Sequence, residues 1–292
     1  MEAWTQSEQY QKVAEANREY YAKTAQLYDA SETCVTNAQI QQQLENDLDQ
    51  IVALLNYPSQ QLHALDACGG TGNVALKLLR RGLNVTISDI SETQLAIFQQ
   101  KCAAENFNVE TLKGEIATLL IGDANHYDLI VFSSALHHLE NISGVLSLAF
   151  ERLKPGGLLF TVFDPTITSN HHKVTKLVLS CDYLLFKVLD QTSDLPFAVA
   201  RRLRRTMEKI FHPTSQGKQA LQLNEETLGV LAEYHVDRGI DDFALVEQLK
   251  QIGFEVVWHL RFPGGRYRLT RWIVGLFKDA TQFKLLLRKL DR

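Results

Sequence analysis

The feature that most constrains the fold is a regular alternation of short apolar runs with amphipathic stretches between residues 62 and 163. The apolar runs have the length of strands, and each is separated from the next by a stretch with helical spacing. Strands that are joined by single helices pair in parallel through right-handed crossovers. The predicted strands are 62–67, 84–88, 109–113, 127–133 and 158–163, and the predicted helices are 73–81, 92–105 and 144–153.

This alternation predicts an α/β fold with a doubly wound, mostly parallel sheet. Ligands of such sheets bind at the carboxyl ends of the strands. Before the sheet, apolar residues from Ile40 to Leu55 recur at helical spacing, which predicts a helix that ends near Pro58.

After Asp164 the alternation stops, and it resumes at Asp241. The intervening stretch is typical of amphipathic helices. We expect a helix to Ile252, a strand at 254–262, a last strand at 272–277 and a short basic helix from Thr281. The predicted organisation is an N-terminal helical segment (1–60), a core (61–165), an inserted helical cap (166–240) and the remainder of the core with a basic C-terminal helix (241–292).

Charge is distributed unevenly along the chain. Residues 1–164 contain 10 Lys and Arg against 20 Asp and Glu, whereas residues 165–292 contain 20 against 14, within a total of −4. The acidic first part argues against nucleic acid as a partner. The basic part is either a set of solvated helix faces, or it suits an anionic substrate or a peripheral contact with a membrane surface.

The four cysteines lie far apart without a C-x-x-C pair, so we expect reduced thiols and neither a zinc site nor disulfides. The start of the chain is acidic, and no apolar run of 18 residues occurs, which predicts a cytoplasmic location. His171, His172 and His235 lack the spacing of zinc ligands. We therefore expect no metal.

The most informative motif is Leu65-Asp66-Ala67-Cys68-Gly69-Gly70-Thr71-Gly72-Asn73, which joins the first strand to the first helix. Glycines allow a tight turn and a close approach of ligand to the main chain. Asp89 ends the second strand, where a carboxylate accepts hydrogen bonds from ribose hydroxyls. Glu115 follows the third strand, where an acid would accept a hydrogen bond from an adenine amino group.

These motifs resemble those of the class I S-adenosylmethionine-dependent methyltransferases. The glycine stretch is similar to that family's first motif, with Ala67 in place of the first glycine or that glycine lost. Further likenesses lie in Tyr127-Asp128-Leu129-Ile130-Val131, Ala135-Leu136-His137-His138-Leu139 and Leu153-Lys154-Pro155-Gly156-Gly157. The resemblance covers residues 60–165. It is nearest to small-molecule and quinone-type methyltransferases, which have a Tyr-Asp pair like Tyr28-Asp29 in their N-terminal helices.

The resemblance implies a seven-stranded Rossmann-like sheet, S-adenosyl-L-methionine as cofactor and a small-molecule substrate. It also implies that the N-terminal segment covers the cofactor. The implied cofactor-binding residues are Tyr28, Asp66, Ala67, Gly69, Gly70, Gly72, Asp89, Ile90, Glu115, Ile116 and Ser133. For Tyr28, core packing is the alternative role.

His137 is the predicted catalytic residue, as general base for a substrate hydroxyl or amine. The alternative is that one imidazole of the His137-His138 pair packs against the sheet while the other bonds a backbone carbonyl. The predicted substrate-binding residues are Tyr21, His138 and His235. His235 has a solvent-facing position as its alternative.

We thus predict methyl transfer to an oxygen or nitrogen of a small molecule. The alternatives are C-methylation of a quinone- or lipid-like acceptor at a membrane surface, a nicotinamide-dependent oxidoreductase, and a non-catalytic cofactor-binding module. The glycine motif and the Leu153–Gly157 turn count against the oxidoreductase. Oligomeric state stays open.

Overall fold

The computed structural model describes residues 3–167, 173–189, 231–232, 234–235, 238–277 and 280–290. The described strands are β1 (His63–Ala67), β2 (Asn84–Asp89), β3 (Glu110–Lys113), β4 (Tyr127–Ser133), β5 (Leu153–Pro165), β6 (Phe254–Phe262) and β7 (Gln282–Lys289). The described α-helices are α1 (Glu8–Ser31), α2 (Thr33–Thr36), α3 (Ala38–Leu55), α4 (Asn73–Arg80), α5 (Glu92–Ala104), α6 (Ile116–Leu119), α7 (Ile142–Arg152), α8 (Lys173–Leu189), α11 (Asp242–Ile252) and α12 (Arg268–Leu276). Short 3-10 turns lie at Ala3–Gln6, Ser59–Gln61 and Leu136–His138.

The strands form one seven-stranded sheet in the order β3-β2-β1-β4-β5-β7-β6. The five strands from β3 to β5 pair in parallel, and β7 is antiparallel to both of its neighbours. This arrangement confirms the predicted Rossmann-like, mostly parallel sheet. The strand order reverses between β1 and β4, which places a ligand crevice at their carboxyl ends.

The predicted end of the chain is wrong in two places. The residues expected to form a last strand, 272–277, mostly belong to helix α12, and the expected basic helix after Thr281 is strand β7. β7 lies between β5 and β6 and is buried on both faces, but Lys284, Arg288 and Lys289 interrupt the apolar run that is typical of such a strand. Its lysines are buried as well: Lys284 pairs with Asp47, and Lys289 bonds the carbonyl of Leu153.

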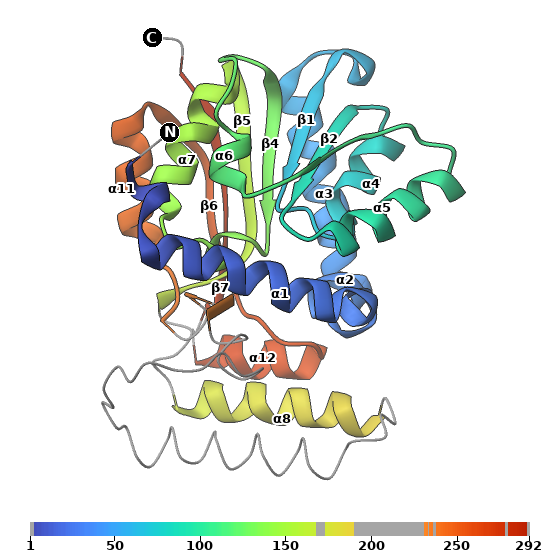
Figure 1. Cartoon of the computed structure of the whole chain (residues 1–292). Coiled ribbons are helices and arrows are strands. Elements are labelled where there is room, and N and C mark those ends of the chain that lie inside the picture. Colours follow the sequence, from blue (N-terminus) through green and yellow to red (C-terminus); the bar gives the residue numbers. More distant parts are fainter. Residues whose placement is uncertain are drawn as a thin grey trace.

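Helices cover both faces of the sheet and its carboxyl edge (Figure 1). One hydrophobic cluster joins the sheet to α6, α7 and α11, and the other joins it to α3, α4 and α5. α1 crosses the carboxyl edge of the strands (Figure 1), and its residues line the pocket at that edge. The N-terminal segment therefore contributes to the site directly.

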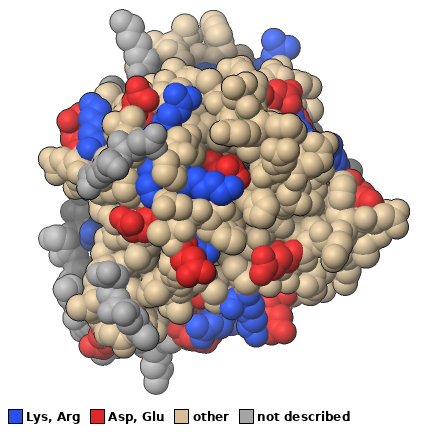
Figure 2. Space-filling view, turned by 90° about the horizontal axis from the view of Figure 1, so that it is seen from above, with Lys and Arg blue, Asp and Glu red and all other residues tan. Residues whose placement is uncertain are grey.

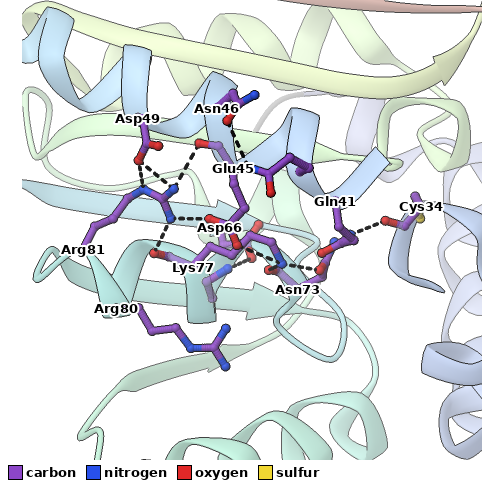
Figure 3. Close-up of polar contacts among 12 residues, drawn as sticks. Cys34, Gln41, Glu45, Asn46, Asp49, Asp66, Asn73, Lys77, Arg80 and Arg81 are labelled. Carbon is purple, nitrogen blue, oxygen red and sulfur yellow. Dashed lines mark hydrogen bonds and ion pairs between the residues drawn. The ribbon is translucent and has the colours of Figure 1, made fainter. Parts of the chain in front are cut away.

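A polar network holds α3 against α4 (Figure 3). The guanidinium of Arg81 pairs with Glu45 and Asp49, both at 2.7 Å, and donates to the carbonyl oxygen of Lys77 at 3.0 Å. The ammonium of the buried Lys77 donates to the carbonyl oxygen and the side-chain oxygen of Asn73. The network fixes the first turn of α4, which lies beside the crevice.

The two ends of the predicted insertion, residues 166 and 240, lie side by side next to the sheet. Thr166 pairs with Ile240, and the carbonyl of Ile240 accepts a hydrogen bond of 2.8 Å from Ile167. Gly239 fits only because it lacks a side chain, since an added Cβ would lie 2.1 Å from the carbonyl oxygen of Thr166. Residues 190–230 of the predicted helical cap lie outside the described residues.

α8 is the helix of this insertion that the structure describes. It lies with α12 beyond the carboxyl edge, on the side of α1 (Figure 1). Asp182 of α8 caps the start of α12 by accepting hydrogen bonds from the backbone of Arg266 and Tyr267 at 2.8 and 3.2 Å and from the hydroxyl of Thr270. Within the described ranges, no helix is long and apolar enough to cross a membrane.

The face at the opposite edge of the sheet carries charges of both signs (Figure 2). Lys and Arg side chains are interspersed with Asp and Glu side chains over the described part of this face. A nucleic-acid surface typically shows clustered cations instead.

Candidate active site

The crevice is a pocket between α1 and the carboxyl ends of β1, β2 and β4. Its described lining comes from α1, α2, the turn after β1, the ends of β2 and β4, and the start of α6. Eleven predicted site residues line it: Tyr21, Tyr28, Asp66, Gly69, Gly70, Asp89, Ile90, Glu115, Ile116, Ser133 and His138. The predicted Ala67, Gly72, His137 and His235 are not among its lining residues.

The turn after β1 shows why the motif is rich in glycine. Gly70 and Gly72 adopt left-handed backbone conformations with φ of 56° and 82°. A Cβ on Gly72 would lie 2.0 Å from the ring of the buried Phe98. Gly72 thus supports the turn from behind, while Gly69 and Gly70 face the pocket.

Two carboxylates stand at the centre of the pocket. Asp89 accepts hydrogen bonds from the backbone N–H of Gly70 at 2.9 Å and of Ser91 at 2.8 Å. Asp66 accepts one from Ala75 at 2.8 Å. Burial raises the pKa of Asp89 to about 6 and that of Asp66 to about 7. Hydrogen bonds or a positive charge from a ligand would therefore favour the ionised forms.

Unpartnered polar atoms cluster in this pocket. In the described part of the chain, seven side chains contain a buried polar atom without a hydrogen-bond partner. Five of the seven line the pocket: Asn17, Asp66, Ser88, Gln94 and Tyr10, whose hydroxyl lies near the carboxylate of Glu115. Because buried polar groups are otherwise almost always paired, these atoms indicate a polar ligand.

Glu115 has a second role that the sequence did not reveal. Its two carboxylate oxygens accept hydrogen bonds from the backbone of Ala117 at 3.0 Å and Thr118 at 3.1 Å, so Glu115 caps α6. The cap fixes the carboxylate at the pocket wall, next to the buried Ile116.

α1 is tied to the glycine turn by the residue after Tyr28. Asp29 accepts a hydrogen bond of 2.5 Å from the hydroxyl of Thr71 and pairs with Lys101 of α5 at 2.5 Å. Lys101 also donates to the carbonyl of Thr71 at 2.9 Å. These contacts place Tyr28 on the pocket wall and join α1 to the core at that point.

The two adjacent histidines face different partners. The ring Nδ1 of His137 lies 2.8 Å from a carboxylate oxygen of the fully buried Asp164, so His137 is turned toward β5. His138 faces the pocket, with its Nε2 2.9 Å from the hydroxyl of Tyr21. The Nδ1 of His138 lies 2.7 Å from the carbonyl of Ala232, which can only accept, so Nδ1 carries the proton.

The electrostatic surroundings keep His138 neutral. Burial, with the nearby His137 as a second cause, lowers the pKa of His138 well below its usual range. Its Nε2 therefore accepts the hydrogen bond from Tyr21. The backbone N–H of His235 donates to the carbonyl of His137 at 2.8 Å, which places His235 beside the pair rather than in the pocket wall.

Sequence reasoning missed Tyr10, Asn17, Ser88 and Gln94 as pocket residues. The helical spacing of Tyr10, Asn17, Tyr21 and Tyr28 on α1 was the available signal, since these positions fall on one face. Among the described residues, no group of three or more His, Cys, Asp or Glu side chains is placed to hold a metal. The pair His171-His172 lies outside the described residues.

Comparison with known proteins bears on both the pocket and the fold. Residues 64–157 match the family described as "Methyltransferase domain". A ubiquinone/menaquinone biosynthesis C-methyltransferase (UbiE) of Zymomonas mobilis is 32% identical over 130 residues, 44% of this chain and 53% of that protein. A tRNA 5-carboxymethoxyuridine methyltransferase of Escherichia coli is 34% identical over 133 residues, 44% of this chain and 49% of that protein. The chain thus spans about half the length of the curated relatives that it matches.

The fold has relatives among solved structures. Magnesium protoporphyrin IX methyltransferase from Synechocystis, with bound S-adenosylhomocysteine, is similar with a TM-score of 0.56 and 16% identity. The likeness covers 95% of this chain and 99% of that chain. This coverage is much larger than the segment 64–157 that the methyltransferase family matches.

Proposed function

Since residues 64–157 match a methyltransferase domain, we propose that the chain is a class I S-adenosylmethionine-dependent methyltransferase that transfers the methyl group of S-adenosylmethionine to a small-molecule acceptor. The observation that carries the proposal is the cluster of unpartnered polar atoms beneath α1. The cofactor offers an ammonium group, two ribose hydroxyls and an adenine amino group. These are donors, and the free lone pairs of Asp66, Asp89 and Glu115 are acceptors.

The bound sulfonium would supply an electrophilic methyl group. The protein's own task is to hold the acceptor in line with that group and to exclude water. α1 covers the pocket for this purpose, held by the contact of Asp29 with Thr71 and by a hydrogen bond of 3.0 Å from the Asn17 amide to the carbonyl of His138.

We assign the acceptor-orienting role to Tyr21 and His138, and with it an oxygen or nitrogen acceptor. His138 is neutral and its Nε2 faces Tyr21, so a proton released by the acceptor has a path through the Tyr21 hydroxyl to the imidazole. His137 was the general base predicted from the sequence. We favour His138 because it lines the pocket, whereas the Nδ1 of His137 is directed at Asp164.

Calorimetric titration with S-adenosylhomocysteine tests the cofactor part of the proposal. Incubation with methyl-labelled S-adenosylmethionine and panels of phenols, amines and quinols then identifies the acceptor. We expect His138→Gln to lower turnover at least about tenfold, in the range usual for a lost general base, with cofactor affinity retained. His137→Gln tests the alternative base, and His63→Gln at the exposed start of β1 is the matched control.

Two outcomes would change the acceptor that we propose. A product methylated at carbon would favour the C-methylation of a quinone-like acceptor, which the name of the Zymomonas relative suggests. Transfer of the labelled methyl group to tRNA would contradict the expectation that no nucleic acid is bound. The name of the Escherichia coli relative is the reason to include tRNA among the acceptors tested. Absence of cofactor binding would refute the proposal itself.

A further inference from the structure

A second cavity, of about 510 Å³, lies at the carboxyl edge of β5 on the face covered by α3. It shares none of its described lining residues with the candidate active site. Its apolar wall includes Ile40, Val162, Phe163, Phe262 and Trp272. The volume falls in the range of small-molecule sites.

The backbone of β5 is distorted to build this wall. Residues alternate between the two faces of a strand, yet Val162 and Phe163 both pack on the α3 side. A register shift between Val162 and Asp164 and a left-handed φ of 69° at Phe163 make this possible. Bulges and left-handed aromatic residues cost free energy and concentrate at functional sites.

The charges of the cavity do not balance. Lys284 donates to both carboxylate oxygens of Asp47 at 2.6 Å, so these two groups neutralise each other. Arg271 remains as an additional cation in the wall. In the part of the chain that the structure describes, no carboxylate lies within ion-pair distance of its guanidinium.

The partners of Arg271 are neutral oxygens. Its guanidinium donates to the carbonyls of Gly265 at 3.0 Å and Arg266 at 3.2 Å, and to the side-chain oxygen of Gln39. Asp182 exerts a favourable charge interaction from α8, but its carboxylate is engaged in capping α12. Burial lowers the pKa of Arg271 from its usual value, as expected for a cation without a close counter-ion.

We propose that this cavity binds an amphipathic carboxylate, with its apolar part against Phe163 and Phe262 and its carboxylate on Arg271. A single guanidinium without an ion-pair partner among the described residues matches a single negative charge, and its planar donors suit a carboxylate. Trp272, which is 62% exposed, stands at the mouth. The proposal goes beyond methyl transfer and does not depend on it.

Dodecanoate and its uncharged counterpart dodecanol, both below their aggregation concentrations, are the probes. Binding is followed by calorimetry and by the fluorescence of Trp272. We expect Arg271→Gln to weaken dodecanoate binding about 10- to 100-fold, the loss of one charged hydrogen-bonded pair, and to leave dodecanol binding unchanged. Arg268→Gln, on the exposed side of the same helix, is the matched control and should change neither affinity.

A second variant keeps the test decisive if Arg271→Gln fails to fold. Gln43 is exposed on α3 at the cavity, so Gln43→Trp should narrow the cavity and weaken both probes without disturbing the core. Equal loss of both probes in Arg271→Gln, or displacement of dodecanoate by S-adenosylhomocysteine, would overturn the proposal. The proposal would also be overturned if the protein bound lipid vesicles but not free dodecanoate, since that result would indicate contact with a membrane surface and not a ligand in the cavity. Unchanged S-adenosylhomocysteine affinity in every variant separates this site from the proposed active site.

Discussion

Replacing Asp89 by alanine removes a pocket-lining carboxylate at the end of β2, which accepts a hydrogen bond from the glycine turn. Its oxygens accept backbone hydrogen bonds from Gly70 and from Ser91, with the N–H of Ile90 also directed at the carboxylate, and lone pairs remain for ligand hydroxyls. Loss of hydrogen bonds to a charged acceptor should weaken S-adenosylhomocysteine binding by about 1–3 kcal/mol, or about 5- to 150-fold.

The free energy of unfolding should change less than the hydrogen bonds alone suggest. Alanine leaves two buried N–H groups without acceptors, at about 1–3 kcal/mol each. It also removes a buried charge whose pKa is raised from 3.8 to about 6, and that burial costs about 3 kcal/mol at neutral pH. We therefore expect a net change between a gain of about 1 kcal/mol and a loss of about 3 kcal/mol, so the variant remains folded at 25 °C.

Calorimetry with S-adenosylhomocysteine and thermal melting without ligand measure the two effects separately. Glu92→Ala removes the same charge from an exposed position at the start of α5 and should change neither quantity appreciably. Cofactor affinity that is unchanged in a folded Asp89→Ala protein would refute the placement of the cofactor in this pocket.

Two further predictions concern ionisation. Affinity for S-adenosylhomocysteine should fall as pH is lowered from 8 to 5, because Asp66 and Asp89 take up protons near pH 7 and 6, and calorimetry across this range checks it. The contribution of these two carboxyls to stability without ligand should change in the opposite direction, since a carboxyl whose folded pKa is raised favours folding most at pH values below that pKa. Urea unfolding of the protein and of Asp89→Asn at pH 5 and 8 separates this contribution from the opposing one of buried His138, whose pKa is lowered. Lys284→Met should lower the free energy of unfolding by about 3–5 kcal/mol by leaving Asp47 buried and unpaired, and adding Asp47→Leu should restore most of it. Equal losses in the single and double variants would contradict that account.

The sequence by itself determined the parts of the molecule that depend on local patterns. The alternation of apolar runs and helical stretches predicted the parallel part of the sheet, because burial of a sheet between helices requires it. The glycine turn and Asp89 were predictable because each depends on a few adjacent residues. Glycines mark a turn that needs a left-handed backbone, and an acid directly after an apolar run marks the end of a strand. β7 was not predictable, because Lys284, Arg288 and Lys289 interrupt its apolar run, and Asp47, which neutralises Lys284, lies 237 residues away in the chain.

Only the tertiary structure decided which of two adjacent histidines faces the pocket. His137 and His138 lie in one 3-10 turn, where successive side chains diverge by about a third of a turn. Asp164, 27 residues away in the chain, bonds one of them, and Tyr21, 117 residues away, bonds the other. The second cavity likewise depends on a bulge in β5 opposite β7 and on the neutralisation of Lys284 by Asp47. Contacts between residues so far apart are set by packing, which periodicity and spacing in one sequence do not encode.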